Sequence, residues 1–287
     1  MPTRLAYPGL LVLFGVIVAH VAGWGPLGIL VAGTAINVVL FVLEQRFPLV
    51  PGDQVVGDPE VPSDLGHTVL ANGIAQASDA AMLAVGAIVA GKLGEAWGLH
   101  LWPTGLPFVV QVLILVIVAD GIEYWRHRLE HRVSWLWPIH ALHHDVVRMH
   151  VLKSARNTFA DMMLRSIVVY GPLAMLGVPR DVIVWHPLTL LVLGPIAHSN
   201  VALPIPAFVH RLIVTPPEHR VHHARSRTLS DGNFAVVTPL WDLVFGTFND
   251  PATCPPPAVG IDERLPAGFV RQVLSPFLWR PVPPLTS

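Results

Sequence analysis

The chain has 287 residues, of which 53% are hydrophobic and only 13% are Asp, Glu, Lys or Arg, and its mean hydropathy is +0.57. Soluble domains carry roughly twice that share of charged residues, so the composition excludes an ordinary soluble protein. A net charge of −1 offers no field that would attract nucleic acid, and a single cysteine excludes an intrachain disulfide and a thiolate metal cluster.

Apolar runs of membrane-spanning length recur along the chain and predict a polytopic membrane protein. The first run follows Arg4 but lacks a clear small-residue cleavage site, so we expect a retained span, not a signal peptide. Turn residues and hydropathy predict spans at 6–22, 27–43, 68–91, 105–126, 160–178 and 181–197. Polar residues in the third span, Asn72, Gln76, Ser78 and Asp79, indicate that one of its faces packs against protein.

Histidines gather in three clusters after the fourth predicted span. The clusters are His127 and His131 (HxxxH), His140, His143 and His144 (HxxHH), and His219, His222 and His223 (HxxHH), with a lone His198 at the end of the last span. Residues at i, i+3 and i+4 share a helix face, so we expect each cluster to aim its rings at one point. Neutral imidazole suits Fe, Zn and Cu. Nine imidazoles exceed what one ion takes, which indicates two ions with positions left for water or dioxygen.

An all-histidine site carries no negative charge, so acidic groups are expected behind the ligands. Asp120, Glu123 and Tyr124 fall on the same helix stripe as His127 and His131. Asp120 and Tyr124 are therefore candidate catalytic residues, the alternative being that Asp120 and Glu123 only pair with Arg126 or Arg128.

Histidines at a membrane exit can also be interfacial residues or stabilise helix C-termini. That interpretation is weak for the clusters together but favoured for scattered histidines: His20, His67, His100, His186 and His210. The sequence leaves the role of His150 open.

The distribution of charge predicts the orientation. With a cytoplasmic N-terminus, residues 44–67, 127–159 and 198–287 face the cytoplasm, and only Lys92 and Arg180 lie in outside loops, as the positive-inside rule requires. Residues 1–104 are then N-terminal transmembrane helices and a linker, 105–250 a histidine-box catalytic region, and 251–287 a Pro-rich tail. The predicted fold is all-α: a bundle of four to six spanning or re-entrant helices, capped by a cytoplasmic helical histidine-rich di-metal domain.

Several motifs together resemble the fatty acid hydroxylase and sterol desaturase superfamily of integral membrane di-iron enzymes. DGIEYWRHRLEH, LWPIHALHH and TPPEHRVHHA resemble its three histidine boxes, DGNFAVVTPLWDLVFGTF its closing signature, and PIAHSNV its His-Ser-Asn element. The resemblance covers roughly residues 105–250. It implies two Fe ions, dioxygen as co-substrate and hydroxylation or desaturation of a lipid C–H bond, with all nine histidines above as ligands and Asn200 as a further candidate catalytic residue.

Two positions depart from the family pattern. SARNTFAD keeps Arg156 but has Thr158 where the family usually has a histidine, and Asp145 follows the second box where Ser is common. The first departure implies one ligand or hydrogen-bond donor fewer, unless His150 compensates.

The predicted function is that of a membrane-bound monooxygenase acting on a lipid taken from the bilayer. No haem, flavin or nicotinamide motif is present, so the electrons are expected from a separate protein that docks on the Arg-bearing face near Arg225 and Arg227. A dinuclear zinc hydrolase and a non-enzymatic metal-handling protein are the alternatives, the former disfavoured because such hydrolases use a bridging carboxylate. The sequence leaves open the lipid, the choice between hydroxylation and desaturation, and the oligomeric state.

Overall fold

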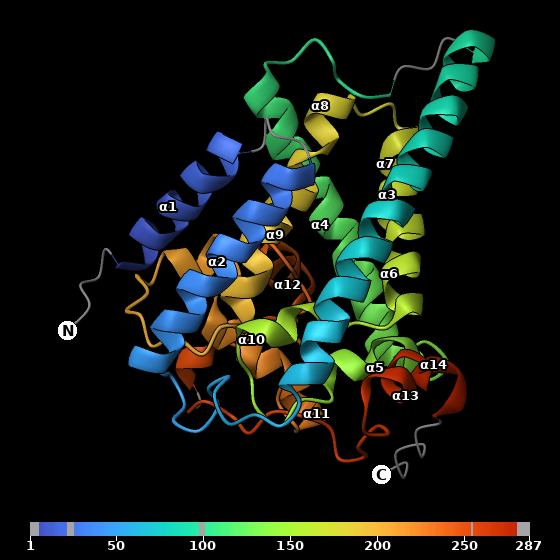
Figure 1. Cartoon of the computed structure of the whole chain (residues 1–287). Helices are drawn as coiled ribbons and strands as arrows, with labels where there is room; N and C mark the ends of the chain where they lie inside the picture. Colours follow the sequence, from blue (N-terminus) through green and yellow to red (C-terminus); the bar gives the residue numbers. More distant parts are fainter. Residues whose placement is uncertain (1–5, 22–25, 98–100, 254, 280–287) are drawn as a thin grey trace.

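The computed structural model describes residues 6–21, 26–97, 101–253 and 255–279. The regular secondary structure of this part of the chain is helical, apart from two isolated β-bridges, Pro48 with Val201 and Ala224 with Val259 (Figure 1). The all-α prediction is confirmed.

Five long helices build the bundle: α1 (Ala6–Val21), α2 (Pro26–Arg46), α3 (Val61–Trp97), α4 (Phe108–Arg132) and α9 (Trp185–His198). Four segments are long and apolar enough to cross a membrane, namely Leu27–Arg46, Ala77–Trp97, Phe108–Arg132 and Arg180–His198, while Ala6–His20 is apolar but shorter. The chain is therefore an integral membrane protein, as its hydropathy predicts.

The helix predicted at 160–178 is present over residues 159–175, as three short helices that follow one another without a break. These are α6 (Phe159–Arg165), the π-helix η3 (Ser166–Tyr170) and α7 (Gly171–Met175). Arg165 pairs with Glu123 of α4, and Ser166 bonds Asp79 of α3, so polar contacts hold this segment inside the bundle. The expected inward packing of the third span is thus seen at Ser78 and Asp79, whereas the side chains of Asn72 and Gln76 lie outside the described residues.

Two apolar cores fill the bundle. One joins α1, α2 and α9 through residues such as Phe14, Ile36 and Ile196. The other joins α4 to η3, α7 and α8 (Arg180–Ile183) through residues such as Leu115 and Leu173. Much of the outer surface of the long helices is also apolar, which suits contact with lipid.

The shorter helices gather at the end of the bundle where α2, α4 and α9 terminate (Figure 1). They are α5 (Trp137–His144), α10 (Pro216–His222), α11 (Arg227–Ser230), α12 (Leu240–Phe245), α13 (Phe269–Val273) and α14 (Ser275–Leu278). Short 3₁₀ turns, η2 (Val151–Ala155), η4 (Val209–Arg211) and η5 (Pro251–Thr253), connect them. The described part of the Pro-rich C-terminal region is packed: α13 contacts α3, and α14 contacts α5.

A buried ionic network joins the N-terminal end of α3 to η2. Lys153 and Arg156 are fully buried, and the Lys153 ammonium lies 2.9 Å from Asp58 and 2.7 Å from Asp64. Arg156 donates to the other oxygen of Asp64 at 2.9 Å. These contacts hold in place the segment that follows α5.

Candidate metal centre

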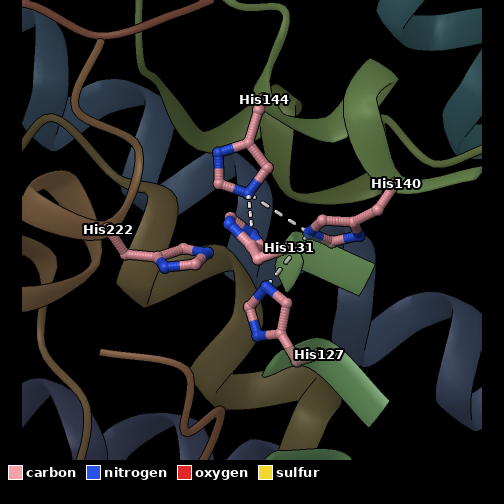
Figure 2. Close-up of side chains that lie close together, drawn as sticks. All are labelled: His127, His131, His140, His144 and His222. Carbon is pink, nitrogen blue, oxygen red and sulfur yellow. Dashed lines mark hydrogen bonds between the residues drawn. The ribbon is translucent and has the colours of Figure 1, made fainter. Parts of the chain in front are cut away.

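The nine histidines predicted as ligands form two adjacent groups of buried rings. The first group is His127, His131, His140, His144 and His222 (Figure 2), and the second is His143, His198, His219 and His223. Within each group the potential ligand nitrogens all lie within 4.8 Å of one another. The groups touch where the rings of His144 and His223 stack, with centroids 4.4 Å apart.

Each HxxHH cluster contributes to both groups, so the expectation that a cluster aims at one point is wrong for these two clusters, whereas His127 and His131 do share one group. Histidines four residues apart stay together: His140 with His144, and His219 with His223. The remaining histidines, His143 and His222, turn to the other group. The reason is that adjacent helical residues differ by about 100°, which lets neighbouring histidines address two points on either side of a helix.

Hydrogen bonds at Nδ1 fix the tautomers of several rings. His127 donates to the Phe234 carbonyl at 2.7 Å, and His222 to the Gly232 carbonyl at 2.8 Å. His198 donates to the Gly194 carbonyl at 2.8 Å. A carbonyl can only accept, so the ring proton sits on Nδ1 and the inward Nε2 keeps its lone pair.

The inward-facing ring nitrogens are better suited to binding a metal ion than to hydrogen bonding with one another. His127 Nε2 and His140 Nε2 lie 3.0 Å apart, and His131 Nε2 and His144 Nε2 lie 3.1 Å apart. His222 Nε2 is buried without a hydrogen-bond partner among the described residues. Where Nδ1 carries the proton, these contacts bring unprotonated nitrogens together, an arrangement that a cation stabilises.

Burial keeps five of the rings outside the spans neutral. It lowers the pKa of His222 to about 3, and it also holds the pKa values of His143, His144, His219 and His223 well below 6.5, with neighbouring histidines adding to the effect. Neutral imidazoles with free Nε2 lone pairs are the form that binds Fe, Zn or Cu.

Two carboxylates lie next to the outer nitrogen of His140, a member of the first group. His140 Nδ1 donates to Asp161 Oδ2 at 2.9 Å and lies 3.5 Å from Glu130. Arg126 bridges the two carboxylates, at 2.9 Å from Asp161 and 2.6 Å from Glu130. A carboxylate on the outer nitrogen orients the ring and makes it a better ligand.

The three candidate catalytic residues bond elsewhere. Asp120 accepts from the backbone N–H groups of residues 236–238, which fixes the segment that follows Phe234. The Tyr124 hydroxyl bonds Thr247 and Arg128, and the Asn200 side chain bonds the backbone of Val50. Their catalytic roles remain predictions, and the structure gives Asp120 an indirect connection to the site through His127 and Phe234.

Sequence reasoning missed Asp161, although a signal was present. Thr158 to Asp161 reads TFAD, and Ser or Thr three residues before an acidic residue is typical of a helix start. Thr158 does cap α6: its hydroxyl oxygen accepts from Asp161 N at 3.1 Å and donates to the Ile139 carbonyl at 2.6 Å. The threonine at the departure from the family pattern therefore positions the acid that holds His140.

His150 does not join either group. Its Nε2 bonds Asp58 at 2.8 Å, in the network where Lys153 occupies the space between the carboxylates. Asp145, at the other departure, pairs with Arg264 at 2.6 Å. Three of the scattered histidines also bond side chains outside the groups: His67 with Gln272, His186 with Tyr170 and His210 with Glu218.

Glu123 fits the ion-pair alternative. Arg126 donates to one of its carboxylate oxygens, and Arg165 lies 2.8 Å from the other. Two further groups of potential ligands, one with Asp58 and one with Glu130, already hold a cationic side chain, Lys153 and Arg126 respectively. The two histidine groups are therefore the candidate metal positions among the described residues.

Fold and site together define a helical integral membrane protein with two adjoining, buried, all-histidine groups that could each hold a metal ion. A family model described as "Fatty acid hydroxylase" matches residues 112–247. The chain belongs to the fatty acid hydroxylase family.

Relatives span several lipid enzymes. "Ornithine lipid hydroxylase OlsE" of Rhizobium tropici is 31% identical over 222 residues, which cover 77% of this chain and 67% of that protein. "Alkylglycerol monooxygenase" of Homo sapiens is 33% identical over 130 residues, 45% of this chain but only 28% of that protein. A "Very-long-chain aldehyde decarbonylase" of Oryza sativa subsp. indica is 30% identical over 168 residues, 55% of this chain and 25% of that protein. No solved structure matches.

Proposed function

We propose that this protein is a membrane-bound oxygenase that hydroxylates a lipid C–H bond with dioxygen and electrons from a separate protein. The observation that carries the proposal is the convergence of nine buried histidines, from three distant segments and the end of α9, into two touching groups. Membership of the fatty acid hydroxylase family supports the reaction class.

Two iron ions would be held by these groups, five histidines for one and four for the other. When bound, they supply dioxygen activation, which imidazole ligands with open coordination positions permit. Asp161 and Glu130 would offset part of the metal charge at the five-histidine group. Burial of all nine rings keeps bulk water from the reacting atoms.

The surface beside His131 supports the docking of an acidic electron donor. Arg225 and Arg227 have side chains 54% and 53% exposed. Arg227 donates to the His131 carbonyl at 2.9 Å and stacks on Trp137, whose ring lies 5.2 Å from that of His131. We infer that this face is cytoplasmic, on the basis of the positive-inside distribution of charge.

The names of the relatives suggest the first substrates to test. Ornithine lipid is the first choice and an alkylglycerol the second, because OlsE aligns over the larger part of both chains. The experiment incubates the iron-loaded protein in lipid vesicles with substrate, a reduced ferredoxin and labelled dioxygen, and follows the lipids by mass spectrometry. We expect one labelled oxygen atom in the product; loss of two hydrogens without oxygen would indicate desaturation.

His219→Ala removes a ligand of the second group and should abolish turnover, whereas His210→Gln, outside both groups, should retain it. Modification of the lipid without dioxygen or reductant would contradict the proposal and favour a hydrolase. The geometry already disfavours that alternative, because Asp161 and Glu130 stand behind His140 instead of between the groups.

A further inference from the structure

The helices α13 and α14 have inverted polarity. Gln272 and Ser275 are turned inward and are 2% and 0% exposed. The outward side chains are apolar and are 44% to 66% exposed: Val270, Leu274, Phe277 and Leu278. A helix beside water shows the opposite pattern, with apolar residues inward and polar residues outward.

The outward residues form one continuous face. They occupy positions i, i+4, i+7 and i+8, which is the spacing of a single helical stripe. Leu274 joins the two helices with right-handed helical backbone (φ −86°, ψ −4°), so the stripe continues from α13 into α14. Arg271, exposed beside Val270, carries a side chain long enough to reach charged headgroups.

Inward contacts prevent this stripe from turning toward the core. Gln272 Oε1 accepts from the Ser63 hydroxyl and lies 3.2 Å from His67 Nε2. The Phe269 ring packs over Gly66, where an added Cβ would lie 2.8 Å from it, and meets the edge of His67 at 4.9 Å. The apolar stripe is therefore held outward by polar bonds to α3.

The apolar surface of α3 continues from a membrane span to α13. Leu65 and Val69 are 50% and 77% exposed, and with Leu70 and Phe269 they line an apolar groove of about 540 Å³. The span Ala77–Trp97 begins eight residues after Val69 in the same helix, α3. The surface that contacts lipid along the span is thus continuous with the groove and with the outward stripe.

We propose that α13 and α14 lie in the plane of the membrane interface, with the outward stripe in the acyl region of the leaflet on the histidine side. Arg271 then lies at the level of the phosphates. Figure 1 shows α13 and α14 beside α5, and Trp279 packs in the same apolar cluster as Trp137 and Ala141 of α5. Because α5 carries His140, His143 and His144, the in-plane helices set the depth of the histidine groups below the lipid surface. This proposal does not rest on the proposed reaction.

The test uses the full chain in phosphatidylcholine and phosphatidylglycerol vesicles, with Cys254→Ser as background. A spin label is attached to Phe277→Cys or, as a second variant, Leu278→Cys, and its collisions with dioxygen and with a water-soluble nickel complex are measured. Asp262→Cys is the matched control, because its side chain is 85% exposed and acidic. We expect the labels at 277 and 278 to collide preferentially with dioxygen, and the ratio to reverse at 262.

Free collision of the labels at 277 and 278 with the nickel complex would place the stripe in water and overturn the proposal. Protection from both reagents would also overturn it, because the stripe would then be covered by protein, such as a second copy of the chain.

Discussion

Asp161 is the residue whose importance the structure raises most. It accepts the Nδ1 proton of His140 and pairs with Arg126, so it sets both the orientation of one ligand and the charge behind it. The pattern TFAD indicates a helix start at Thr158, but which ring meets Asp161 depends on how α6 packs against α5, and no local pattern contains that information.

Replacing Asp161 with Asn should weaken metal binding at the five-histidine group by about 10- to 100-fold, because Asn keeps the shape but removes the charge behind the ligand. Chelator titration with metal analysis should show one of two ions lost early, and the Mössbauer spectrum should change at one site. Asp181→Asn, at an exposed position on α8, is the control. Equal retention of both ions by Asp161→Asn would contradict this role.

Thr158→Val should destabilise the protein by about 1–2 kcal/mol, because it removes the cap of α6 and leaves the buried Ile139 carbonyl without its donor. Thr158→Ser retains the hydroxyl, so its stability should stay close to that of the parent protein. Thermal unfolding in detergent compares the two variants, and equal midpoints would show that the hydroxyl contributes nothing.

At the scale of elements, hydropathy and turn residues suffice to locate the long helices. They do not indicate how the helical segment 159–175 is anchored, because the polar partners of Arg165 and Ser166 lie on α4 and α3 and are distant in sequence. The distribution of histidines between the two groups is beyond a single helix pattern for the same reason: it depends on where α4, α5, α9 and α10 stand relative to one another.

The contact of α12 with α4 is linked to the five-histidine group through a chain of hydrogen bonds. A Cβ on Gly121 would lie 2.8 Å from the Trp241 ring, and the next residue, Asp242, accepts the backbone N–H groups of Phe234 and Ala235. Phe234 in turn accepts from His127. Displacement of α12 should therefore move a ligand ring.

Gly121→Ala should cost about 1–3 kcal/mol through overpacking, and it should lower metal content at the five-histidine group. Gly91→Ala, on α3 where an added Cβ meets nothing within 4 Å, should leave metal content unchanged and be neutral or slightly stabilising. Metal analysis and thermal unfolding of both variants check this, and full metal content in Gly121→Ala would refute the connection.

At the scale of the whole molecule, membrane class, family and the identity of the clustered histidines can all be predicted from composition and motif spacing. The buried network of Lys153, Arg156 and Asp64 cannot, because Asp64 is 89 residues from Lys153 and 92 from Arg156, and each residue alone suggests an exposed charge. The network forms only where α3 and η2 pack together in the folded protein.

Neutral buried histidines make the stability of the metal-free protein depend on pH. The folded-state pKa values of His143, His144, His219, His222 and His223 lie below the ordinary value, so below about pH 6.5 the unfolded chain takes up protons that the folded protein does not. The stabilisation that the neutral rings contribute is then fully present above about pH 6.5. As the pH drops below this value, the free energy of unfolding decreases by up to about 1.4 kcal/mol per pH unit for each histidine.

Thermal unfolding of the metal-free protein should show a midpoint that is constant from pH 8 to pH 7 and that decreases from pH 6.5 to pH 5.5. Bound metal should move the decrease to lower pH, because it competes with protons for the same nitrogens. A midpoint that does not change over the whole range would mean that the rings are not neutral as argued.

His143 with His144, and His222 with His223, are neighbours in the chain that serve different groups. One peptide unit, about 3.8 Å between consecutive Cα atoms, thus connects the two positions at two separate places. A displacement of α5 or α10 would carry a histidine of each group in the same movement, so the spacing of the two groups is tied to covalent geometry. Occupancy of one position should therefore prearrange the other, so that binding at the first position raises the affinity of the second.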